Sequence, residues 1–390
     1  MKVSKISPLS ESSLEDIGLY WHTDLDNTSY IENEVVEVSK EEALAFYNAG
    51  NELYEMFIEA GEYVIKNDLF FELDIPNTLI ESIKESFESE IHWHVYGRFD
   101  FAGGLDGKPI KLLEFNADTP TLLYESAIIQ WALLKHNHMN EDLQFNNIFE
   151  SISNNFKRMI TLGGDINRFS DLYEGWKILF SSIRGNIEEE KTTRFLLSCA
   201  EEAGFECEFC YIDEVNFNEK NGVFYNDKNY EFLFKLLPWE IISIDEPELA
   251  LIISNMMKNK NTIFINPPYT LLFQSKRMLK ILWDLFPNHD LLLHTSFEEI
   301  PNKKQVRKVS FGREGENIDI LDSNRVLESK DGIYSSYKSI YQEFYELNSF
   351  NGFYYQPNVF FAYESCGLGF RKGGNIMDNM AKFVSHIIKD

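Results

Sequence analysis

The chain has 390 residues, more than a single small core accommodates, so we expect two or three lobes fused around a cleft. Its apolar fraction of 44% and charged fraction of 25% are those of an ordinary folded protein. The 36 Lys and Arg residues are outnumbered by 63 Asp and Glu, and the formal charge of -27 argues against a nucleic-acid partner, because most of the surface would repel a phosphate backbone.

The N-terminal stretch MKVSKISPLSESS lacks the apolar segment of a secretion signal. No run reaches the roughly 18 apolar residues that a membrane span needs. We therefore expect a cytoplasmic protein with no membrane partner. If the substrate is a polyanion, basic residues must be gathered locally in this acidic chain, so their positions are informative.

The first 90 residues are expected to be mainly helical. Residues 39–66 show helical spacing of apolar positions after a Ser-x-x-Glu start, and 77–90 repeat this spacing. The period then changes to two, which predicts strands in HWHVYGRFDF and GKPIKLLEFN. A helix is expected in TPTLLYESAIIQWALLKHN, capped by Asp118 or Thr119, and another at about 142–160.

From Gly175 onward strands and helices alternate, which predicts an α/β lobe followed by a second β-rich lobe. Asn226 and Asp227 mark a hairpin corner, and the β-rich lobe begins near Val306 with a strand, a glycine loop and a strand. The other expected elements are strands at 176–183, 205–212, 353–364 and 367–371, and helices at 187–203, 246–258 and 376–388.

The predicted organisation is a mixed α/β (α+β) fold without internal repeats or low-complexity linkers. We divide it into a mainly helical N-terminal part at 1–90, a β-hairpin with helices at 91–175, an α/β lobe at 176–300 and a C-terminal β-rich lobe at 301–390.

Two short apolar segments carry polar side chains two residues apart. Arg98 and Asp100 lie in YGRFDF, and Glu114 and Asn116 lie in LLEFN. Residues two apart on a strand share a face, so each pair projects from one side of its strand.

The turn between these strands decides whether the two pairs share one face. A two-residue Asp-Gly turn would place them on opposite faces. A three-residue loop that ends at Gly107, with Gly107 in the left-handed conformation, places Arg98 opposite Glu114 and makes Asp100 and Asn116 diagonal neighbours. We expect this loop or another of the same parity.

Side-chain oxygens gathered on one face form a site that Mg²⁺ prefers, and substrate phosphates complete its coordination. The donors here are Asp100, Glu114 and Asn116. Arg98 beside them suits an oxyanion or a phosphoryl group in transfer. Charged residues are also common on open strand faces, so the spacing is equally compatible with two solvent-facing, salt-bridged ladders.

The basic residues elsewhere favour a triphosphate site. Lys235 lies in the mostly apolar run FLFKLLPWE, where an unpaired ammonium is costly, so we expect an anionic partner. Lys308 precedes Gly312 and Gly315 in KVSFGREGEN, where backbone N–H groups can cradle phosphate oxygens. Arg371 follows in GLGFRKGG. Each alone is compatible with an ordinary surface charge.

The motifs YGRFDF, LLEFNADTPT, KLLPWE, ILWDLFPNH, REGENI and GLGFR, in this order, resemble the synthetase domain of glutathionylspermidine synthase, an ATP-grasp ligase, and its stand-alone relatives. The resemblance covers most of the chain from about residue 90 to the end, and the first two motifs together are its most specific part. It implies an ATP-grasp-like fold in which two β-rich lobes enclose a nucleotide cleft. We expect a stand-alone member without the amidase domain of the bifunctional relatives.

The resemblance also implies roles for individual residues. Arg98 matches the arginine that stabilises the phosphoryl group in transfer. Two departures from the family pattern are Lys372 and Gly373, which replace acidic residues and weaken the expectation of a cationic amine, and SFGREGEN, which lacks the usual Lys-Pro opening. The other implied roles are Mg²⁺ ligands at Asp100, Glu114 and Asn116, ATP contacts at Lys235, Lys308 and Arg371, and thiol-peptide contacts at Thr119 and Thr121.

We therefore expect an ATP- and Mg²⁺-dependent carboxylate–amine ligase. ATP would phosphorylate the carboxylate of a glutathione-like peptide, and an amine such as a polyamine would displace the phosphate to form an amide. Two alternatives stay open: a non-catalytic nucleotide or polyamine binder of the same fold, and a kinase that stops at the phosphorylated product.

Overall fold

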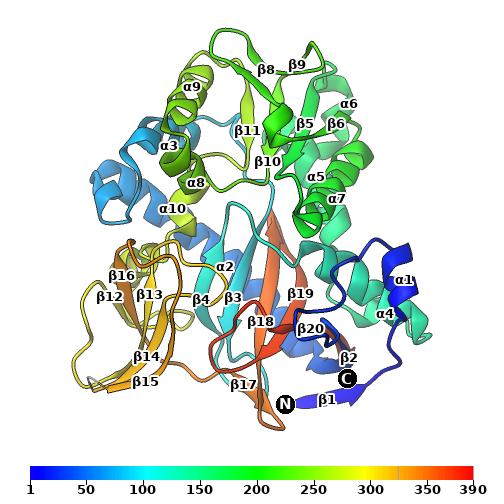
Figure 1. The fold of residues 1–390 in the computed structure, drawn as a ribbon, viewed down its shortest axis with the longest axis vertical. Coiled ribbons are helices and arrows are strands. Elements are labelled where there is room, and N and C mark those ends of the chain that lie inside the picture. Colours follow the sequence, from blue (N-terminus) through cyan, green and yellow to red (C-terminus); the bar gives the residue numbers. More distant parts are fainter. Residues whose placement is uncertain (324, 390) are drawn as a thin grey trace.

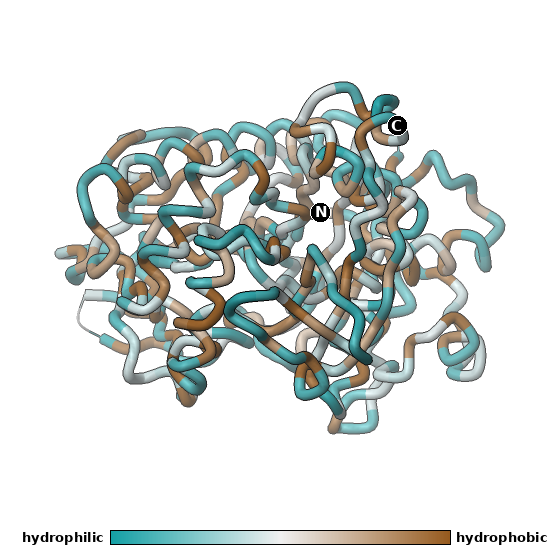
Figure 2. The backbone as a smooth tube through the Cα atoms, turned by 90° about the horizontal axis from the view of Figure 1, so that it is seen from above, coloured by the Kyte–Doolittle hydropathy of each residue, from teal (hydrophilic) through white to brown (hydrophobic). Residues whose placement is uncertain are grey.

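The structure is a computed structural model of the chain and describes residues 1–323 and 325–389. It is a mixed α/β fold with four β-sheets (Figure 1). A parallel sheet with its helices lies at the top of this view, above an eight-stranded and a five-stranded sheet. Along the tube of Figure 2, hydrophobic residues come in short runs between hydrophilic ones. Within the described residues, none of the helices combines the length and the apolar character that a bilayer crossing requires.

The eight-stranded central sheet brings the two ends of the chain together. In sheet order its strands are β1 (Lys2–Lys5), β2 (Ile31–Ser39), β20 (Lys382–Lys389), β19 (Glu364–Gly373), β18 (Phe353–Ala362), β3 (Gly97–Ala102) and β4 (Lys111–Asn116), with β17 (Asn348–Phe350) on β18. Strand β20 pairs in parallel with β2 and antiparallel with β19. The hairpin of β3 and β4 forms one edge of the sheet.

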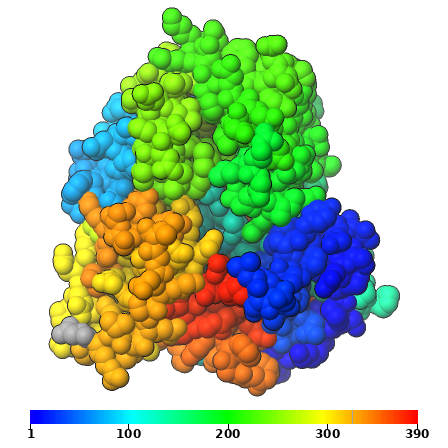
Figure 3. Space-filling model, viewed as in Figure 1, coloured from blue at the N-terminus to red at the C-terminus, as the bar shows by residue number. Residues whose placement is uncertain are grey.

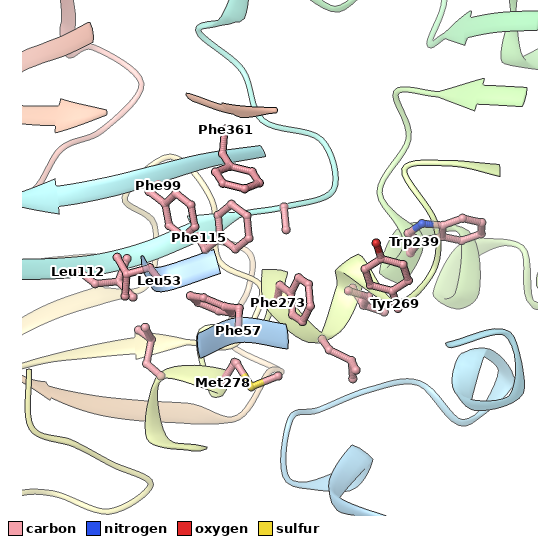
Figure 4. Packing of buried hydrophobic residues seen from close by; sticks show 14 of the residues in the cluster. Leu53, Phe57, Phe99, Leu112, Phe115, Trp239, Tyr269, Phe273, Met278 and Phe361 are labelled. Carbon is pink, nitrogen blue, oxygen red and sulfur yellow. The ribbon is translucent and has the colours of Figure 1, made fainter. Parts of the chain in front are cut away.

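A 27-residue helix, α2 (Lys40–Lys66), packs against the central sheet. Its start is a capping box: the backbone N–H of Glu42 donates to the Ser39 hydroxyl at 3.1 Å, and the Ser39 N–H donates to the Glu42 carboxylate at 2.8 Å. On the buried face, the ring of Phe57 lies 5.0 Å from that of Phe115 (Figure 4). The helix therefore holds the core side of the β3–β4 hairpin.

The α/β lobe is built on a parallel four-stranded sheet, whose central strands are buried on both faces. The strands, in sheet order, are β11 (Ile263–Ile265), β10 (Phe232–Lys235), β5 (Lys177–Ser182) and β6 (Glu206–Tyr211). The helices around them are α3 (Ile80–Glu88), α5 (Ile148–Thr161), α6 (Phe169–Leu172), α7 (Ile187–Ala203), α8 (Trp239–Asp245) and α9 (Pro247–Lys258). A small sheet of β7 (Asn216–Asn218), β8 (Gly222–Tyr225) and β9 (Lys228–Tyr230) extends from this lobe.

The five-stranded lobe is antiparallel and follows two helices, α10 (Thr270–Gln274) and α11 (Met278–Leu285). In sheet order its strands are β12 (Thr295–Ser296), β16 (Ser339–Glu343), β13 (Lys304–Val309), β14 (Ile318–Asp322) and β15 (Arg325–Lys330). Two short helices, α1 (Glu11–Asp16) and α4 (Gln130–His136), lie beside the N-terminal strands of the central sheet (Figure 1).

Most of the expected elements are confirmed. Helices α2, α7 and α9 match the predicted 39–66, 187–203 and 246–258 within one residue. Asn226 and Asp227 form the corner between β8 and β9, both with positive φ. The strand, glycine loop and strand near Val306 are β13, the loop and β14.

Three expectations are wrong. The helix predicted at 376–388 is strand β20 at Lys382–Lys389, because this segment is buried from both sides and its apolar run lacks the alternation of a half-exposed strand. The sequence predicts a mainly helical part at residues 1–90, but strands β1 and β2 lie there as well. The helix after β4 begins at Leu123, so neither Asp118 nor Thr119 caps it.

Candidate active site

A cavity of about 460 Å³ lies where the central sheet, the five-stranded lobe and the start of α7 meet. In Figure 3 the blue N-terminal, green α/β, orange five-stranded and red C-terminal surfaces converge on the middle of this face. All the site residues predicted from the sequence line this cavity, except Lys235.

The four paired residues share one face of the β3–β4 hairpin. Arg98 lies opposite Asn116, and Asp100 lies opposite Glu114. The predicted parity is therefore confirmed, but the predicted pairing of Arg98 with Glu114 is wrong. A β-bulge between Asp100 and Phe101 shifts the register by one residue and restores the shared face.

The connection between the strands is longer than the expected three-residue loop. It runs from residue 103 to residue 110. Gly107 has a φ of 73°, so its predicted left-handed conformation is confirmed. The bulge, which the sequence does not indicate, corrects the register that the turn alone would have set.

The other face of the hairpin is core. Phe99 and Phe115 stack with ring centroids 3.9 Å apart, and Phe361 of β18 meets Phe99 edge-on (Figure 4). Alternate residues of each strand are thus fixed by aromatic packing, and the polar residues between them are held towards the cavity. This excludes the alternative of two solvent-facing ladders, since Arg98 and Asp100 are buried.

Arg98 and Asp100 form a bidentate ion pair. The Arg98 Nε and Nη2 groups donate to the Asp100 carboxylate at 2.7 and 2.9 Å, and Asn358 donates to the same carboxylate at 2.8 Å. Burial opposes the charge on Arg98, but Asp100 outweighs it and raises the arginine pKa. Asn116 links the cluster by donating to Asp100 at 3.3 Å and to Glu114 at 3.1 Å.

Two lysines reach the same cluster from other elements. Lys276, between α10 and α11, lies 3.2 Å from the Glu114 carboxylate and donates to the Gly312 carbonyl at 2.6 Å. Lys308 of β13 donates to the Leu113 carbonyl at 3.1 Å. Burial raises the pKa of Glu114, but Lys276 and Lys308 outweigh it and hold that pKa at about 2. Burial and the neighbouring Lys276 lower the pKa of Lys308 to about 8.

Lys276, which the sequence did not single out, lines the cavity, whereas Lys235 does not. Lys235 is buried outside the cavity, 3.2 Å from the Asp118 carboxylate, and donates to the Leu237 carbonyl at 2.7 Å. Its Nζ also lies 4.0 Å from the ring centre of Trp239. The expected anionic partner of Lys235 is thus Asp118. Lys235 interrupts an apolar run, whereas Lys276 stands in the polar stretch QSKR, which gave no signal of a site.

The glycine loop between β13 and β14 lies next to Lys276 and Lys308. Gly315 has a φ of 70°, and a Cβ there would overlap the Met377 carbonyl oxygen. At Gly312 a Cβ would lie 2.8 Å from Val309 Cγ2. Arg313, also unpredicted, forms an ion pair with the buried Glu240 of α8 and so ties the loop to the α/β lobe.

On the opposite side the cavity is acidic. Glu188 and Glu189 open α7, where the Asn186 side chain accepts the Glu189 N–H at 3.2 Å. Burial, with Glu125 and Glu189 nearby, raises the pKa of Glu188 to about 8, and burial raises that of Glu189 to about 7. Sequence reasoning missed both, because acidic residues are ordinary in the first turn of a helix.

Arg371 and the two threonines complete this side. Arg371 donates to the Asp378 carbonyl, and its buried Nε has no hydrogen-bond partner among the described residues. Thr119 and Thr121 line the cavity, and the Thr121 carbonyl accepts from Arg98 at 2.8 Å. Arg371 acts electrostatically on Glu188, so this side combines a cation with carboxylates.

Lys372 has no part in the cavity. It follows Arg371 on β19 and binds Glu32 at 3.1 Å and Glu34 at 2.8 Å in β2. Neither Lys372 nor Gly373 lines the cavity, so these two departures from the family pattern add no charge to its wall.

Among residues 1–323 and 325–389, no three His, Cys, Asp or Glu side chains are grouped as metal ligands. Asp100 and Glu114 supply only two carboxylates, and Asn116 adds an amide oxygen. The Asn116 Oδ1 accepts only a 3.5 Å contact from the Gln274 amide, too long for a strong hydrogen bond, and so remains available as a metal ligand. A small, hard oxygen set fits a cation that takes most of its ligands from water and phosphate.

The chain matches the family described as glutathionylspermidine synthase preATP-grasp over residues 1–389. A Haemophilus influenzae protein with the provisional name acid–amine ligase is 29% identical over 390 residues, which cover 94% of this chain and 90% of that protein. The bifunctional glutathionylspermidine synthetase/amidase of Escherichia coli is 26% identical over 80% of this chain, which spans about half of that protein, 52%. A solved glutathione synthetase-like effector from Globodera pallida has a TM-score of 0.59, covering 97% of this chain and 96% of its own, at 10% identity, a likeness of fold alone.

Proposed function

The chain belongs to the glutathionylspermidine synthase family, and from this premise we propose that it is an ATP- and Mg²⁺-dependent ligase that joins a carboxylate to an amine through an acyl phosphate. The observation that best supports the proposal is that Arg98, Lys276 and Lys308 meet two carboxylates on one cavity. The related proteins are named for acid–amine and glutathione–spermidine ligation, so we infer a peptide carboxylate and a polyamine-like amine as substrates.

The cationic end of the cavity is assigned to the phosphates of ATP, within an ATP-grasp-like arrangement of the lobes. Lys276 and Lys308 would balance the phosphate charge, and the glycine loop, which lines the same cavity, would bring its backbone close to the phosphates. Lys276 replaces Lys235 in this role. Arg98 uses three of its five N–H groups on Asp100 and Thr121, which leaves two for the phosphoryl oxygens.

The proposed reaction has two steps. A carboxylate oxygen of the first substrate attacks the terminal phosphorus of ATP, and the bond to the bridging oxygen breaks with its electron pair, so ADP leaves. The amine nitrogen then attacks the acyl carbon, inorganic phosphate leaves, and the nitrogen loses a proton to give the amide. Arg98 stabilises the charge that develops on the phosphoryl oxygens, and no enzyme nucleophile is required.

Asp100, Glu114 and Asn116 are the residues that would hold Mg²⁺. When bound, the ion neutralises charge on the phosphates. Until then Arg98 and Lys276 balance the two carboxylates. This balance explains how a buried, acidic cluster is stable in the free protein.

The acidic end of the cavity is assigned to the amine substrate. Glu188 and Glu189 attract a cation once they are ionised, and the unpartnered Nε of Arg371 suits a second carboxylate of the peptide substrate. Thr119 and Thr121, which line the same cavity, are assigned to the peptide substrate.

The test is ADP release measured over a panel of peptide carboxylates and polyamines. We expect release only when both partners and Mg²⁺ are present. Arg98→Lys keeps the charge but loses the bidentate geometry, so turnover should fall by roughly 100-fold or more while ATP affinity changes by less than about threefold. Arg184→Lys, at an exposed ion pair with Asp213, is the matched control and should behave as wild type.

Other outcomes would contradict the ligase. Tight ATP binding without turnover in any substrate mixture would identify a nucleotide-binding relative. A stable phosphorylated product, detected by mass spectrometry without the amine, would identify a kinase. Equal losses in Arg98→Lys and Arg184→Lys would remove Arg98 from the reaction.

A further inference from the structure

A short N-terminal segment, residues 21–30, forms one wall of the cavity. Five of its ten residues line the cavity: Trp21, Thr23, Asp24, Leu25 and Tyr30. We call this segment the flap. In Figure 3 the blue N-terminal surface lies against the red C-terminal surface beside the hollow.

The flap folds back on itself as a tight loop. The Asp24 N–H donates to the Thr28 carbonyl at 2.9 Å, and the Asn27 N–H donates to the Asp24 carbonyl at 2.9 Å. Asn27 adopts a left-handed conformation with a φ of 62°. This turn places Leu25 at the tip, where its side chain is 91% exposed although it borders the cavity.

The base of the flap is fixed by one buried carboxylate. Trp21 Nε1 and the Tyr30 hydroxyl both donate to Oε1 of Glu125, at 2.8 and 3.0 Å. Glu125 is only 1% exposed, and no cation is paired with it in the described part of the chain. It therefore serves as a fixed acceptor for the two ends of the flap.

The tip of the flap is held from the C-terminal strand. Lys382 of β20 forms an ion pair with Asp24 and a hydrogen bond with Thr28. Asp24 is thereby paired with a cation, and the apolar groups that the flap offers to a ligand are the indole of Trp21, the isobutyl group of Leu25 and the ring of Tyr30. These are apolar surfaces at an otherwise charged cavity.

The flap lies on the acidic side of the cavity. Tyr30 is within electrostatic reach of Glu188 and Arg371. A cation bound at Glu188 would therefore have the flap beside it. A ligand that binds both the Glu188 carboxylate and the apolar side chains of the flap carries a positive charge followed by a methylene chain.

We propose that the flap determines which amine the enzyme accepts, with Leu25 covering the aliphatic chain of a diamine or polyamine whose ammonium group faces Glu188. This inference rests on the proposed function, because it assigns the amine substrate to that side of the cavity. Discrimination would come from chain length, since each methylene covered by the flap adds apolar contact.

The experiment is calorimetric binding of 1,2-diaminoethane, 1,4-diaminobutane and spermidine to wild type, Leu25→Ala and Leu44→Ala. Leu44 is a 58% exposed residue of α2 that does not line the cavity, and it is the matched control. Wild-type affinity should rise along the series. Leu25→Ala should weaken spermidine binding by roughly five- to tenfold and leave 1,2-diaminoethane within about twofold.

The outcomes separate this inference from the ligase proposal. If Leu25→Ala binds all three amines as Leu44→Ala does, or if wild type does not bind spermidine, the flap has no such role. If binding follows the expected pattern but no amine promotes ADP release, the flap stands and the ligase proposal fails. An independent readout is tryptophan fluorescence: spermidine should change the wild-type signal, and Trp21→Phe should remove most of that change.

Discussion

Glu188 is the residue of the acidic wall whose pKa is raised furthest. Burial raises its pKa from 4.5 to about 8, with the negative charges of Glu125 and Glu189 adding to the effect. The folded protein therefore binds a proton that the unfolded chain releases above pH 4.5. Its contribution to stability is present below that pH and is lost as the pH rises towards 8.

The same shift predicts the pH dependence of amine binding. A cationic amine needs the ionised form of Glu188, and a pKa of about 8 makes that form about tenfold more abundant at pH 9 than at pH 7. Spermidine affinity should rise by roughly that factor over this range, measured by calorimetry. In Glu188→Gln the dependence should flatten. A wild-type affinity that is constant or falls with pH would contradict the assignment.

At the scale of single residues, site residues on the same strand could be predicted from their spacing. Site residues that distant elements bring to the same cavity could not. Arg98, Asp100, Glu114 and Asn116 follow from a spacing of two on adjacent strands. Lys276 does not, because its partners Glu114 and Gly312 lie more than thirty residues away in either direction.

Among the elements, the glycine loop offers a controlled comparison. Gly315 and Gly107 have nearly the same φ, 70° and 73°, but a Cβ at Gly107 meets nothing within 4 Å. Alanine at either position should cost roughly 1 kcal/mol of stability from the left-handed backbone. Only Gly315→Ala also pushes the loop away from the Met377 carbonyl.

The expected difference is in nucleotide use. Gly315→Ala should raise the KM for ATP by roughly tenfold, since the loop can no longer present its N–H groups correctly. Gly107→Ala should keep the wild-type KM, and Gly315→Ala should show the larger fall in Tm because its Cβ also meets the Met377 carbonyl. Equal ATP kinetics in the two variants would mean that the loop conformation does not serve the phosphates.

Elements with local signals were predictable, and elements that depend on distant partners were not. The capping box at Ser39 and Glu42 identified α2 from four residues. Strand β20 gave no such signal, and one of its two pairing partners, β2, lies about 350 residues earlier, as in Val36 with His386. The bulge between Asp100 and Phe101 is likewise set by packing on both sides of the hairpin.

In the whole molecule, three separate lobes must be held in place for the cavity to exist. Arg313 and Glu240 join the glycine loop to α8. Lys235, at the end of β10, and Asp118, just after β4, join the α/β lobe to the central sheet. The family resemblance predicted lobes around a cleft. The ion pairs that join these lobes link residues far apart in the sequence, so the spacing of residue types could not predict them.

The Lys235–Asp118 pair tests whether Lys235 has a structural role in place of a role in nucleotide binding. Both side chains are at most 1% exposed, and Asp118 also accepts the Trp239 N–H at 3.0 Å. Asp118→Asn leaves a buried ammonium beside a neutral amide, so the free energy of unfolding should fall by about 3–5 kcal/mol in denaturant titrations. Adding Lys235→Met removes that ammonium, while the asparagine oxygen still accepts from Trp239, so much of the loss should be recovered.

The double variant separates the two roles of Lys235. If Lys235 is structural, Asp118→Asn with Lys235→Met should bind ATP as wild type does, within about threefold, whereas Lys276→Met should weaken ATP by roughly tenfold or more because it removes a cation from the phosphate end. A stable double variant that has lost ATP affinity would return Lys235 to the nucleotide site. The expected result would assign phosphate binding to Lys276 and Lys308. Lys235 would then serve only to hold the α/β lobe against the central sheet.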